Sequence, residues 1–247
     1  MRVHKLPSSN LSALLQKLEA RKPLTPADRN AVLSLPHKIK SLRRHEFIVR
    51  ENGLTSESCV LLSGFAMRHK ATGNGDRQIF SIHMCGDLID LHSSLPGRAD
   101  HNVQMLSNGE AAFIPVEAVR SLAARNPVIA EALWLETLVD AAIFREWTLN
   151  VGRRDARSRL SHMLCEFAVR LEALGLGEAT QYDLPMTQEE LSDTLALTPI
   201  HVNRTLRALA AEGLVIRTNR SVKIVDWHAL AKVGDFDTGY LHLPGDR

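Results

Sequence analysis

The spacing of apolar residues predicts two short helices in residues 186–215, MTQEELSDTLALTPIHVNRTLRALAAEGLV. The apolar positions that recur at helical spacing are Leu191, Leu195 and Leu197, then Val202, Leu206 and Leu209. The pattern predicts helices over roughly 188–195 and 199–212, joined by about three residues. Two helices at this separation are typical of a helix-turn-helix.

Capping residues stand where these two helices should begin and end. Thr187 can accept from free backbone N–H groups of the first helix, with Glu190 at the capping-box position. Thr198 followed by Pro199 is typical of a second helix start, where the missing N–H of proline costs nothing. Gly213 then stands where a C-cap glycine would end the second helix.

The second helix presents hydrogen-bonding side chains away from its apolar face. The outward positions are Ile200, His201, Asn203, Arg204 and Arg207. Asparagine and arginine carry paired groups that match adenine and guanine edges in a major groove. From His201 to Lys223 there are five basic residues and one acid, Glu212. This stretch predicts DNA binding; the alternative is a helical hairpin with a solvated basic face.

A small wing should follow the second helix, because LVIRTNRSVKIVD predicts two short strands around a Thr-Asn-Arg-Ser turn. Together with the helices it forms the predicted DNA-binding surface. The residues expected to contact DNA are Thr187, Gln188, Thr198, Pro199, Ile200, His201, Asn203, Arg204, Arg207, Thr218 and Arg220.

A β-rich region precedes the helices, from about residue 38 to residue 115. Short β-prone runs alternate there with turn signals, and TGNGDR is a hairpin turn. The glycines that punctuate the region are Gly53, Gly64, Gly73, Gly75, Gly86 and Gly109. This rhythm predicts an antiparallel barrel or sandwich.

A long apolar helix is predicted over about 126–150. Val128, Leu135, Ala142 and Leu149 recur every seven residues, and Leu138 lies between them. Such a helix needs cover on more than one side, so we expect these residues to form a homodimer seam. The alternative is a helix buried within one chain. NVGRRDARSRL is a hinge, so we expect an effector-type barrel domain at 1–150 and a DNA-binding domain at 151–247.

Composition narrows the class of protein. The net charge of the 247 residues is only +2, so affinity for nucleic acid must come from a local patch. No apolar run approaches the ~18 residues of a membrane span, and we expect no membrane partner. The N-terminus lacks the apolar stretch of a signal peptide. Cys59, Cys85 and Cys165 are widely spaced, which favours a cytoplasmic location.

The predicted order of elements is a barrel, a long helix, a hinge and a winged helix-turn-helix. In this order the chain resembles the CRP/FNR family of bacterial transcription regulators. The resemblance is carried by GFAMRHKATGNGDRQIFSIHMCGDLIDL, GRRDARSRLSHMLCEFAVRL and TPIHVNRTLRALAAEGLV. It implies an α+β fold: an N-terminal cyclic-nucleotide-binding-type antiparallel β-barrel (jelly-roll), a long dimerisation helix and a C-terminal winged helix-turn-helix. It also implies a homodimer on a two-fold symmetric operator, with double-stranded DNA and RNA polymerase as partners.

The chain departs from family members that bind cyclic AMP. Those members carry a Gly-Glu pair; here the region reads GDLIDL, with Asp90 and Leu91 near the position of the expected acid. Their Arg-Ser pair falls on Ala99 and Asp100, with Arg98 out of register. An aspartate at a phosphate position repels the anion instead of donating to it. We therefore expect no tight binding of cyclic AMP; a cyclic-nucleotide-responsive regulator is the alternative.

An effector of another kind would occupy a pocket between the barrel and the long helix. Phe144 and Arg145 stand there in place of the family's hydroxyl pair. The residues of this possible effector pocket are Asp87, Asp90, Leu91, Arg98, Asp100, His101, Phe144 and Arg145. The effector itself is not identified by the sequence.

Catalysis and resident cofactors are not expected. No cysteine precedes Cys59, so the iron–sulfur cluster of the oxygen-sensing branch has no ligands. The barrel has no H-x-H pair of a cupin metal site, because His83 is followed by Met84 and Cys85. We expect no metal, no cofactor and no catalytic residue, and Cys85 is more readily explained by packing than by a redox role. A cupin-like ligand or metal sensor without DNA binding is the remaining alternative.

Overall fold

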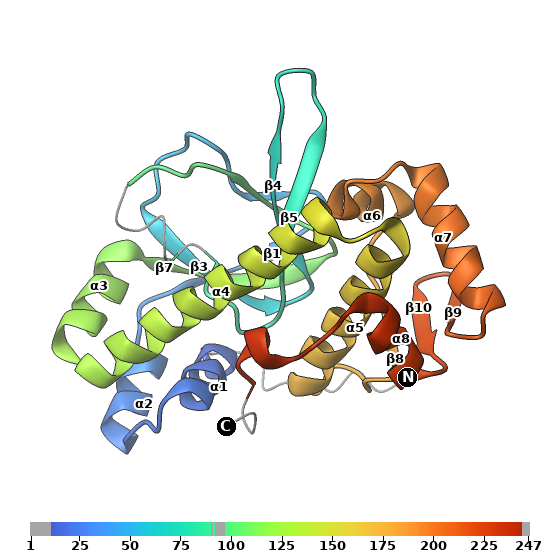
Figure 1. The fold of residues 1–247 in the computed structure, drawn as a ribbon. Helices are drawn as coiled ribbons and strands as arrows, with labels where there is room; N and C mark the ends of the chain where they lie inside the picture. Colours follow the sequence, from blue (N-terminus) through green and yellow to red (C-terminus); the bar gives the residue numbers. More distant parts are fainter. Residues whose placement is uncertain (1–10, 90, 92–96, 244–247) are drawn as a thin grey trace. The chain divides into compact units, whose positions relative to one another are not determined.

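The computed structural model describes residues 11–89, 91 and 97–243, and its backbone packs as two compact units. The first comprises the described residues up to Thr72 together with Phe80–Ala141. The second comprises Gly73–Ile79 and the described residues from Ala142 onward. Helix α4, Pro127–Arg153, passes from the first unit into the second without a break (Figure 1). The functional division into 1–150 and 151–247 stays a prediction.

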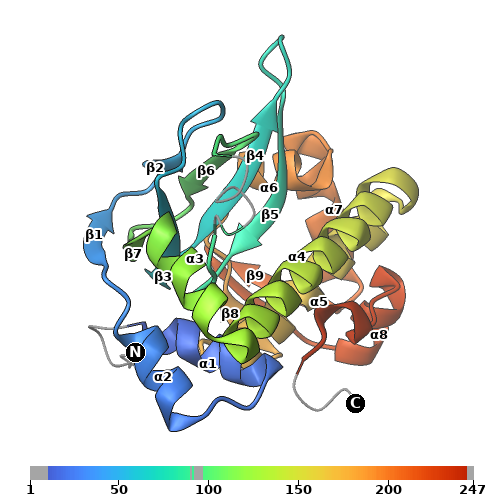
Figure 2. The same ribbon diagram turned by 90° about the vertical axis from the view of Figure 1, so that its left-hand side faces the viewer.

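Antiparallel sheets form the centre of the first unit. Their strands are β1 (Lys38–Leu42), β2 (Phe47–Val49), β3 (Glu57–Ser63), β4 (Ala66–Ala71), β5 (Arg77–His83), β6 (Asn102–Met105) and β7 (Gly109–Pro115). One sheet has the order β1-β7-β3 and the other β2-β6-β4-β5 (Figure 2). Gly109 is required where β7 passes β3, because a Cβ there would lie 2.1 Å from the Ser63 carbonyl oxygen. The β-rich region predicted between residues 38 and 115 is confirmed.

Helices α1 (Ser12–Arg21), α2 (Pro26–Leu33) and α3 (Val116–Arg125) complete the first unit with the start of α4. Their apolar faces share one buried cluster with β3 and β7. Its members include Leu14, Leu18, Val32, Val60, Ile114, Val119, Leu122, Ile129 and Leu133. Fully burying one such side chain contributes about 1.5–3 kcal/mol, so this cluster fixes the first half of α4 to the barrel.

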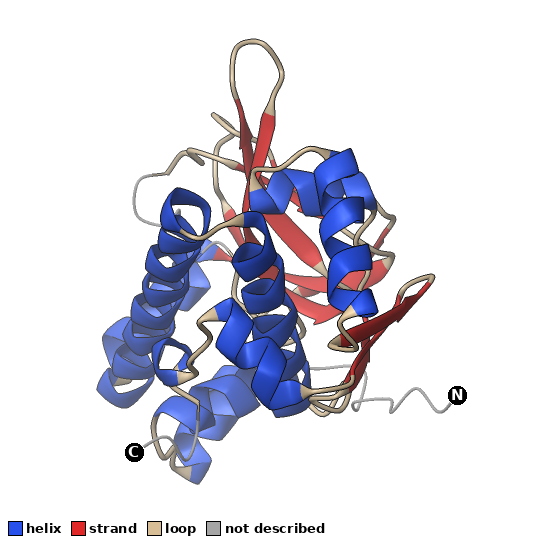
Figure 3. Cartoon of the chain, turned by 45° about the vertical axis from the view of Figure 1, so that its right-hand side comes forward, coloured by secondary structure: helices blue, strands red, loops and turns tan. Residues whose placement is uncertain are grey.

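The second unit holds α5 (Ala156–Ala173), β8 (Gln181–Asp183), α6 (Gln188–Leu195), α7 (Pro199–Ala211), β9 (Val215–Thr218), β10 (Ser221–Ile224), α8 (Trp227–Gly234) and a 3-10 turn at Gly239–Leu241. A small sheet has the order β8-β10-β9. Figure 3 draws the strands of the chain in red and its helices in blue. Helices α5 and α8 meet backbone to backbone, since a Cβ on Gly234 would lie 2.6 Å from the backbone nitrogen of His162. The helices predicted over roughly 188–195 and 199–212 and the predicted wing are confirmed. Helices α1 and α8 and strand β8 were not predicted.

No described helix is long and apolar enough to cross a membrane.

Candidate nucleic-acid interface

Side-chain caps hold α6 and α7 at a fixed turn. The Thr187 hydroxyl accepts from the Glu190 N–H at 3.1 Å, and the Glu190 carboxylate accepts from the Thr187 N–H at 2.7 Å. Ala196 ends α6 in the left-handed conformation, with φ of 52°. Two residues later the Thr198 hydroxyl accepts from the His201 N–H at 3.2 Å and starts α7. The capping box and the second cap predicted from the sequence are therefore both present.

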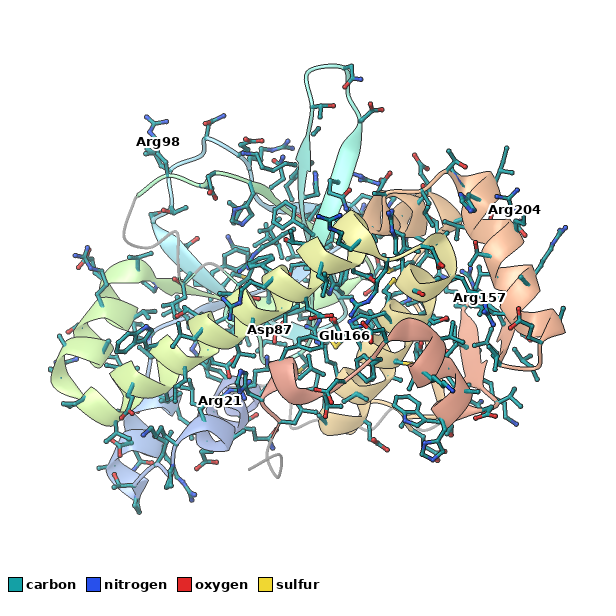
Figure 4. All side chains as sticks on the ribbon, viewed as in Figure 1. Arg21, Asp87, Arg98, Arg157, Glu166 and Arg204 are labelled. Atoms are coloured by element: carbon teal, nitrogen blue, oxygen red, sulfur yellow. The ribbon has the colours of Figure 1, made fainter. Side chains whose placement is uncertain are left out.

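The inner face of α7 is buried and its outer face is open to solvent. Val202 and Leu209 are 0% exposed and Leu206 is 9% exposed. On the outer face one hollow is lined by Ile200, Asn203, Arg204 and Arg207. These residues follow the i, i+3, i+4, i+7 spacing of one helix face. Figure 4 shows Arg204 projecting from α7 away from the rest of the unit.

The open face of α7 is electropositive because its cations are not neutralised locally. Arg204 and Arg207 form no ion pair within the part of the chain that the structure describes. The first turn of α7 contains no acidic residue. Glu212 follows the helix, and its carboxylate is paired with Arg157 of α5. Two guanidinium groups therefore remain available to an anionic partner.

A second hollow leads from α7 to the wing. Its lining residues are Gln188, Asn203, Leu206, Arg207, Ala210, Val215, Arg217 and Asn219. Asn203 lies between the two helices, its amide 3.4 Å from the Gln188 side-chain oxygen. Arg217 donates to the Met186 carbonyl at 3.3 Å, and burial lowers its pKa. Arg217 and Asn219 are not among the residues that the sequence predicts to contact DNA, although both lie in the wing sequence.

The wing tip carries the remaining predicted contacts. Thr218 and Arg220 are exposed on either side of Asn219, whose φ of 56° makes the tight turn between β9 and β10. The Arg220 carbonyl accepts from the Leu184 N–H at 2.7 Å and holds the turn against the segment before α6. The predicted DNA-binding residues thus come from the start of α6, the outer face of α7 and the wing of one compact unit.

A buried carboxylate elsewhere in the second unit was not predicted. Glu166 of α5 is 2% exposed and accepts from the Trp147 indole N–H at 2.8 Å and the Tyr240 hydroxyl at 2.7 Å. Arg170 donates to its other oxygen at 3.1 Å. Next to it, His162 is 3.0 Å from the Tyr240 hydroxyl. The cluster joins the end of α4, α5 and the C-terminal segment. An acid inside the apolar run SHMLCEFAV was the signal available in the sequence.

The first unit encloses a different set of charges. Arg68 of β4 is 1% exposed and donates to the Asp140 carboxylate at 2.5 Å and to the Ile89 carbonyl. Burial favours a higher pKa for Asp140, but Arg68 and His83 outweigh burial and hold that pKa below its usual range. Burial, reinforced by Arg68, lowers the pKa of His83. An arginine within GFAMRHKA was the only sequence signal for this pair.

The predicted pocket residues of the barrel do not converge on one point. Asp87 pairs with Lys17 and with His83, whereas Arg98 donates to the Asn52 carbonyl at 3.0 Å. Figure 4 shows Arg98 at the edge of the barrel, well away from Asp87.

The other pocket residues are spread over three places. The Asp100 carboxylate is 84% exposed and accepts from His101, while Leu91 is half-buried. Asp90 lies outside the described residues. Phe144 and Arg145 belong to the part of α4 in the second unit. The effector pocket therefore stays a prediction.

Comparisons with known proteins agree over most of the chain. The cyclic nucleotide-binding domain family matches residues 39–126, and the Crp-like helix-turn-helix domain family matches residues 158–233. The nitrogen fixation regulation protein FixK of Azorhizobium caulinodans is 25% identical over 93% of this chain and 91% of its own length. The transcriptional activator protein FnrL of Cereibacter sphaeroides is 28% identical over 73% of this chain and 74% of its own.

The chain belongs to the CRP/FNR family of transcription regulators. Among solved structures, FixK2 from Bradyrhizobium japonicum has the same fold, with a TM-score of 0.74 at 23% identity over 81% of this chain and 98% of that one. A CooA variant from Carboxydothermus hydrogenoformans has a TM-score of 0.65 at 15% identity over 92% and 96%. The predicted fold class, a cyclic-nucleotide-binding-type barrel followed by a helix-turn-helix, is confirmed.

CRP/FNR regulators bind DNA as dimers, and α4 of this member carries exposed apolar side chains. Trp134 is 66% exposed, Leu138 50%, Leu149 44% and Val128 40%. At 100° per residue these four lie within one third of the helix circumference. Leu135 is half-buried and Ala142 is buried within the chain. The assignment of Val128, Leu135, Leu138, Ala142 and Leu149 to a dimer seam stays a prediction, to which the structure adds Trp134.

The cysteines of this CRP/FNR member are buried thiols. Burial raises the pKa of Cys85 to about 11 and that of Cys165 to about 12, which keeps both protonated at neutral pH. The Cys85 thiol donates to the Leu62 carbonyl at 3.0 Å. Within the described residues no group of three or more His, Cys, Asp or Glu side chains could hold a metal ion.

Proposed function

We propose that this chain is a sequence-specific regulator that binds a two-fold symmetric operator as a homodimer. The observation that carries the proposal is the open face of α7. It places Asn203, Arg204 and Arg207 side by side without local carboxylates. A helix with this chemistry fits a major groove, where arginine donates to guanine and asparagine pairs with adenine. The helix caps at Thr187 and Thr198 hold that face in place.

Arg204 tests the proposal directly. Its guanidinium can donate to guanine N7 and O6, a contact that discriminates by ~1–3 kcal/mol. A homodimer makes this contact once in each half-site, so Arg204→Ala should weaken binding to a selected operator by roughly 2–6 kcal/mol. Arg207→Ala is the matched control, since we expect a phosphate contact there and an equal loss on all sequences. We also expect Thr198 to contact phosphate, but Thr198→Ala would remove the cap of α7 as well.

Fluorescence anisotropy on the operator and on a scrambled duplex separates these cases. If Arg204→Ala weakens both duplexes alike, Arg204 contacts phosphate and the base assignment is wrong. A salt series adds a second criterion, because phosphate contacts release counterions and make affinity fall steeply with salt. Binding that does not change with salt would contradict the proposed function as a whole.

We propose that the exposed apolar stripe on α4 forms the dimer seam. Leu138→Glu would place a charge in a dry interface and should give monomers in light scattering. Leu138 suits the test because it is 50% exposed, so the substitution spares the core of the single chain. Thr148→Glu, at an exposed position about 80° around α4 from Leu138 and outside the stripe, is the matched control and should stay dimeric. A dimeric Leu138→Glu protein would rule out this seam.

We propose that the barrel domain responds to an effector other than cyclic AMP. Arg98 is engaged with a backbone carbonyl, and the exposed Asp100 would repel a phosphate. Calorimetry at micromolar cyclic AMP should show no saturable heat, and a saturable titration would overturn this point. Membership in a family of transcription regulators leads us to propose a non-enzymatic cytoplasmic protein, with RNA polymerase as its further partner.

A further inference from the structure

The first turn of α7 exposes an apolar side chain where most of the surface for DNA is polar. Ile200 is 83% exposed, more than any other large apolar residue described. Pro199 before it has no N–H, and the Thr198 hydroxyl oxygen accepts from the His201 N–H as a cap. Isoleucine can neither donate nor accept a hydrogen bond. This turn therefore presents an apolar, methyl-bearing surface to a binding partner.

The position of Ile200 connects that methyl surface to DNA recognition. Scattered exposed apolar residues are common and need no function. Ile200, however, lines the same hollow as Asn203, Arg204 and Arg207, at one-turn spacing on the same helix face. In helix-turn-helix proteins the N-terminal residues of the recognition helix contact base edges. A side chain one turn before Arg204 then lies over the base pair next to the one that Arg204 contacts.

Only one base offers a matching group in the major groove. Thymine carries a C5-methyl, whereas guanine, adenine and cytosine present acceptors or donors at their edges. Packing isoleucine on those polar edges would remove water from groups that gain no new partner, which is costly. Packing it on a methyl buries apolar surface on both sides. We infer that Ile200 recognises a thymine C5-methyl in each half-site, an inference that rests on the proposed function.

The thymine methyl can be removed without altering base pairing, by replacing thymine with deoxyuridine. Burying one methyl-sized group corresponds to about a fourfold change in affinity. We expect a loss of about threefold to fivefold for one half-site and about tenfold to twentyfold for both. The effect should be confined to one thymine per half-site, adjacent to the guanine whose contact depends on Arg204.

The experiment begins with an operator selected from random duplexes by the full-length dimer. Each thymine is then replaced in turn by deoxyuridine, and affinities are measured for the wild type, Ile200→Ala and Arg204→Ala. The wild type and Arg204→Ala should lose affinity at the same thymine. Ile200→Ala should bind the thymine duplex and its deoxyuridine counterpart equally. Ile200→Val, which keeps a branched apolar side chain, should retain part of the discrimination.

A cytosine duplex provides the converse test. When the critical thymine is replaced by cytosine, adding a C5-methyl to that cytosine should restore affinity to the wild type but not to Ile200→Ala. Equal deoxyuridine sensitivity in the wild type and Ile200→Ala, or none at any thymine, would overturn the inference while leaving DNA recognition intact. Failure of the wild type to select any sequence would instead overturn the proposed function.

Discussion

Arg68 and Arg204 carry the same guanidinium group in opposite surroundings. Arg68 is 1% exposed inside the barrel unit and bonded to Asp140 and a backbone carbonyl. Arg204 lies on the outer face of α7 and forms no ion pair within the described chain. The first guanidinium has lost its water and uses its donors to hold strands to a helix. The second keeps its hydration and can give all its donors to a partner.

The two arginines teach that burial, more than residue type, decides what a charged side chain does here. A buried ion pair is costly to break because the remaining charge has no water to replace its partner. An exposed arginine costs the fold almost nothing and retains its full capacity for a bidentate contact. The barrel unit therefore uses its charges for architecture, whereas the winged unit keeps some of them for recognition.

The largest expected effect on stability is that of Asp140→Ala. It removes the carboxylate from Arg68 and should lower the free energy of unfolding by about 3–5 kcal/mol. Urea unfolding followed by circular dichroism measures this. Asp140→Asn, which keeps an acceptor oxygen, should lose less. Glu117→Ala, which breaks the exposed pair with Arg120, should change stability by less than about 1 kcal/mol. Equal losses in Asp140→Ala and Glu117→Ala would remove the contrast between buried and exposed charges.

Tyr240→Phe should have the next largest effect. It deletes the hydroxyl that donates to Glu166 at 2.7 Å, and hydrogen bonds to charged groups are worth about 1.5–3 kcal/mol. Tyr182→Phe is the matched control, because its hydroxyl donates to the neutral Leu164 carbonyl at 2.8 Å. That control should lose about 0.5–1.5 kcal/mol. A greater loss in the control would mean that the Glu166 contact contributes little.

Acid should destabilise the winged unit through His162. Burial lowers the pKa of this 1% exposed histidine below its usual 6.5. The unfolded chain then binds a proton near pH 6.5 that the folded chain does not, so stability is full above that pH and falls below it. The slope is at most about 1.4 kcal/mol per pH unit. Unfolding at pH 7.5 and 5.5 should show a smaller difference for His162→Gln, and identical differences would exclude His162.

The smallest expected effect belongs to Arg204→Ala. Its side chain has no partner to lose within the described chain, so the free energy of unfolding should stay within about 0.5 kcal/mol of the wild type. The same urea series measures it. A loss comparable to that of Asp140→Ala would mean that Arg204 supports the fold, and its effect on DNA binding would then be indirect.

Local signals explain how much of the recognition surface could be predicted. The α6–α7 pair is delimited by Thr187, Thr198 and Gly213, each of which acts within a few residues of its own position. Helical spacing then determines which side of α7 faces out. The same kind of signal exists for α1, where Leu11, Leu14 and Leu18 are buried at helical spacing.

Long-range pairs explain most of what the sequence did not reveal. Arg68 and Asp140 are separated by 72 positions, and Glu166 and Tyr240 by 74. No local pattern links such residues, because the tertiary fold alone brings them together. Arg98 shows the converse case, since it stands near the family's phosphate-binding motif but its guanidinium is directed to the Asn52 carbonyl.

The contact between Glu166 and Tyr240 has a consequence for the order of events during protein synthesis. Tyr240 is added to the growing chain 74 residues after Glu166. At about 5–20 residues per second, the ribosome takes roughly 4–15 s to supply it. During that interval the residues of α6, α7 and the wing are synthesised while the Glu166 carboxylate of the same unit still lacks one of its donors. The residues of the recognition helix are therefore synthesised before the unit that carries them can be complete.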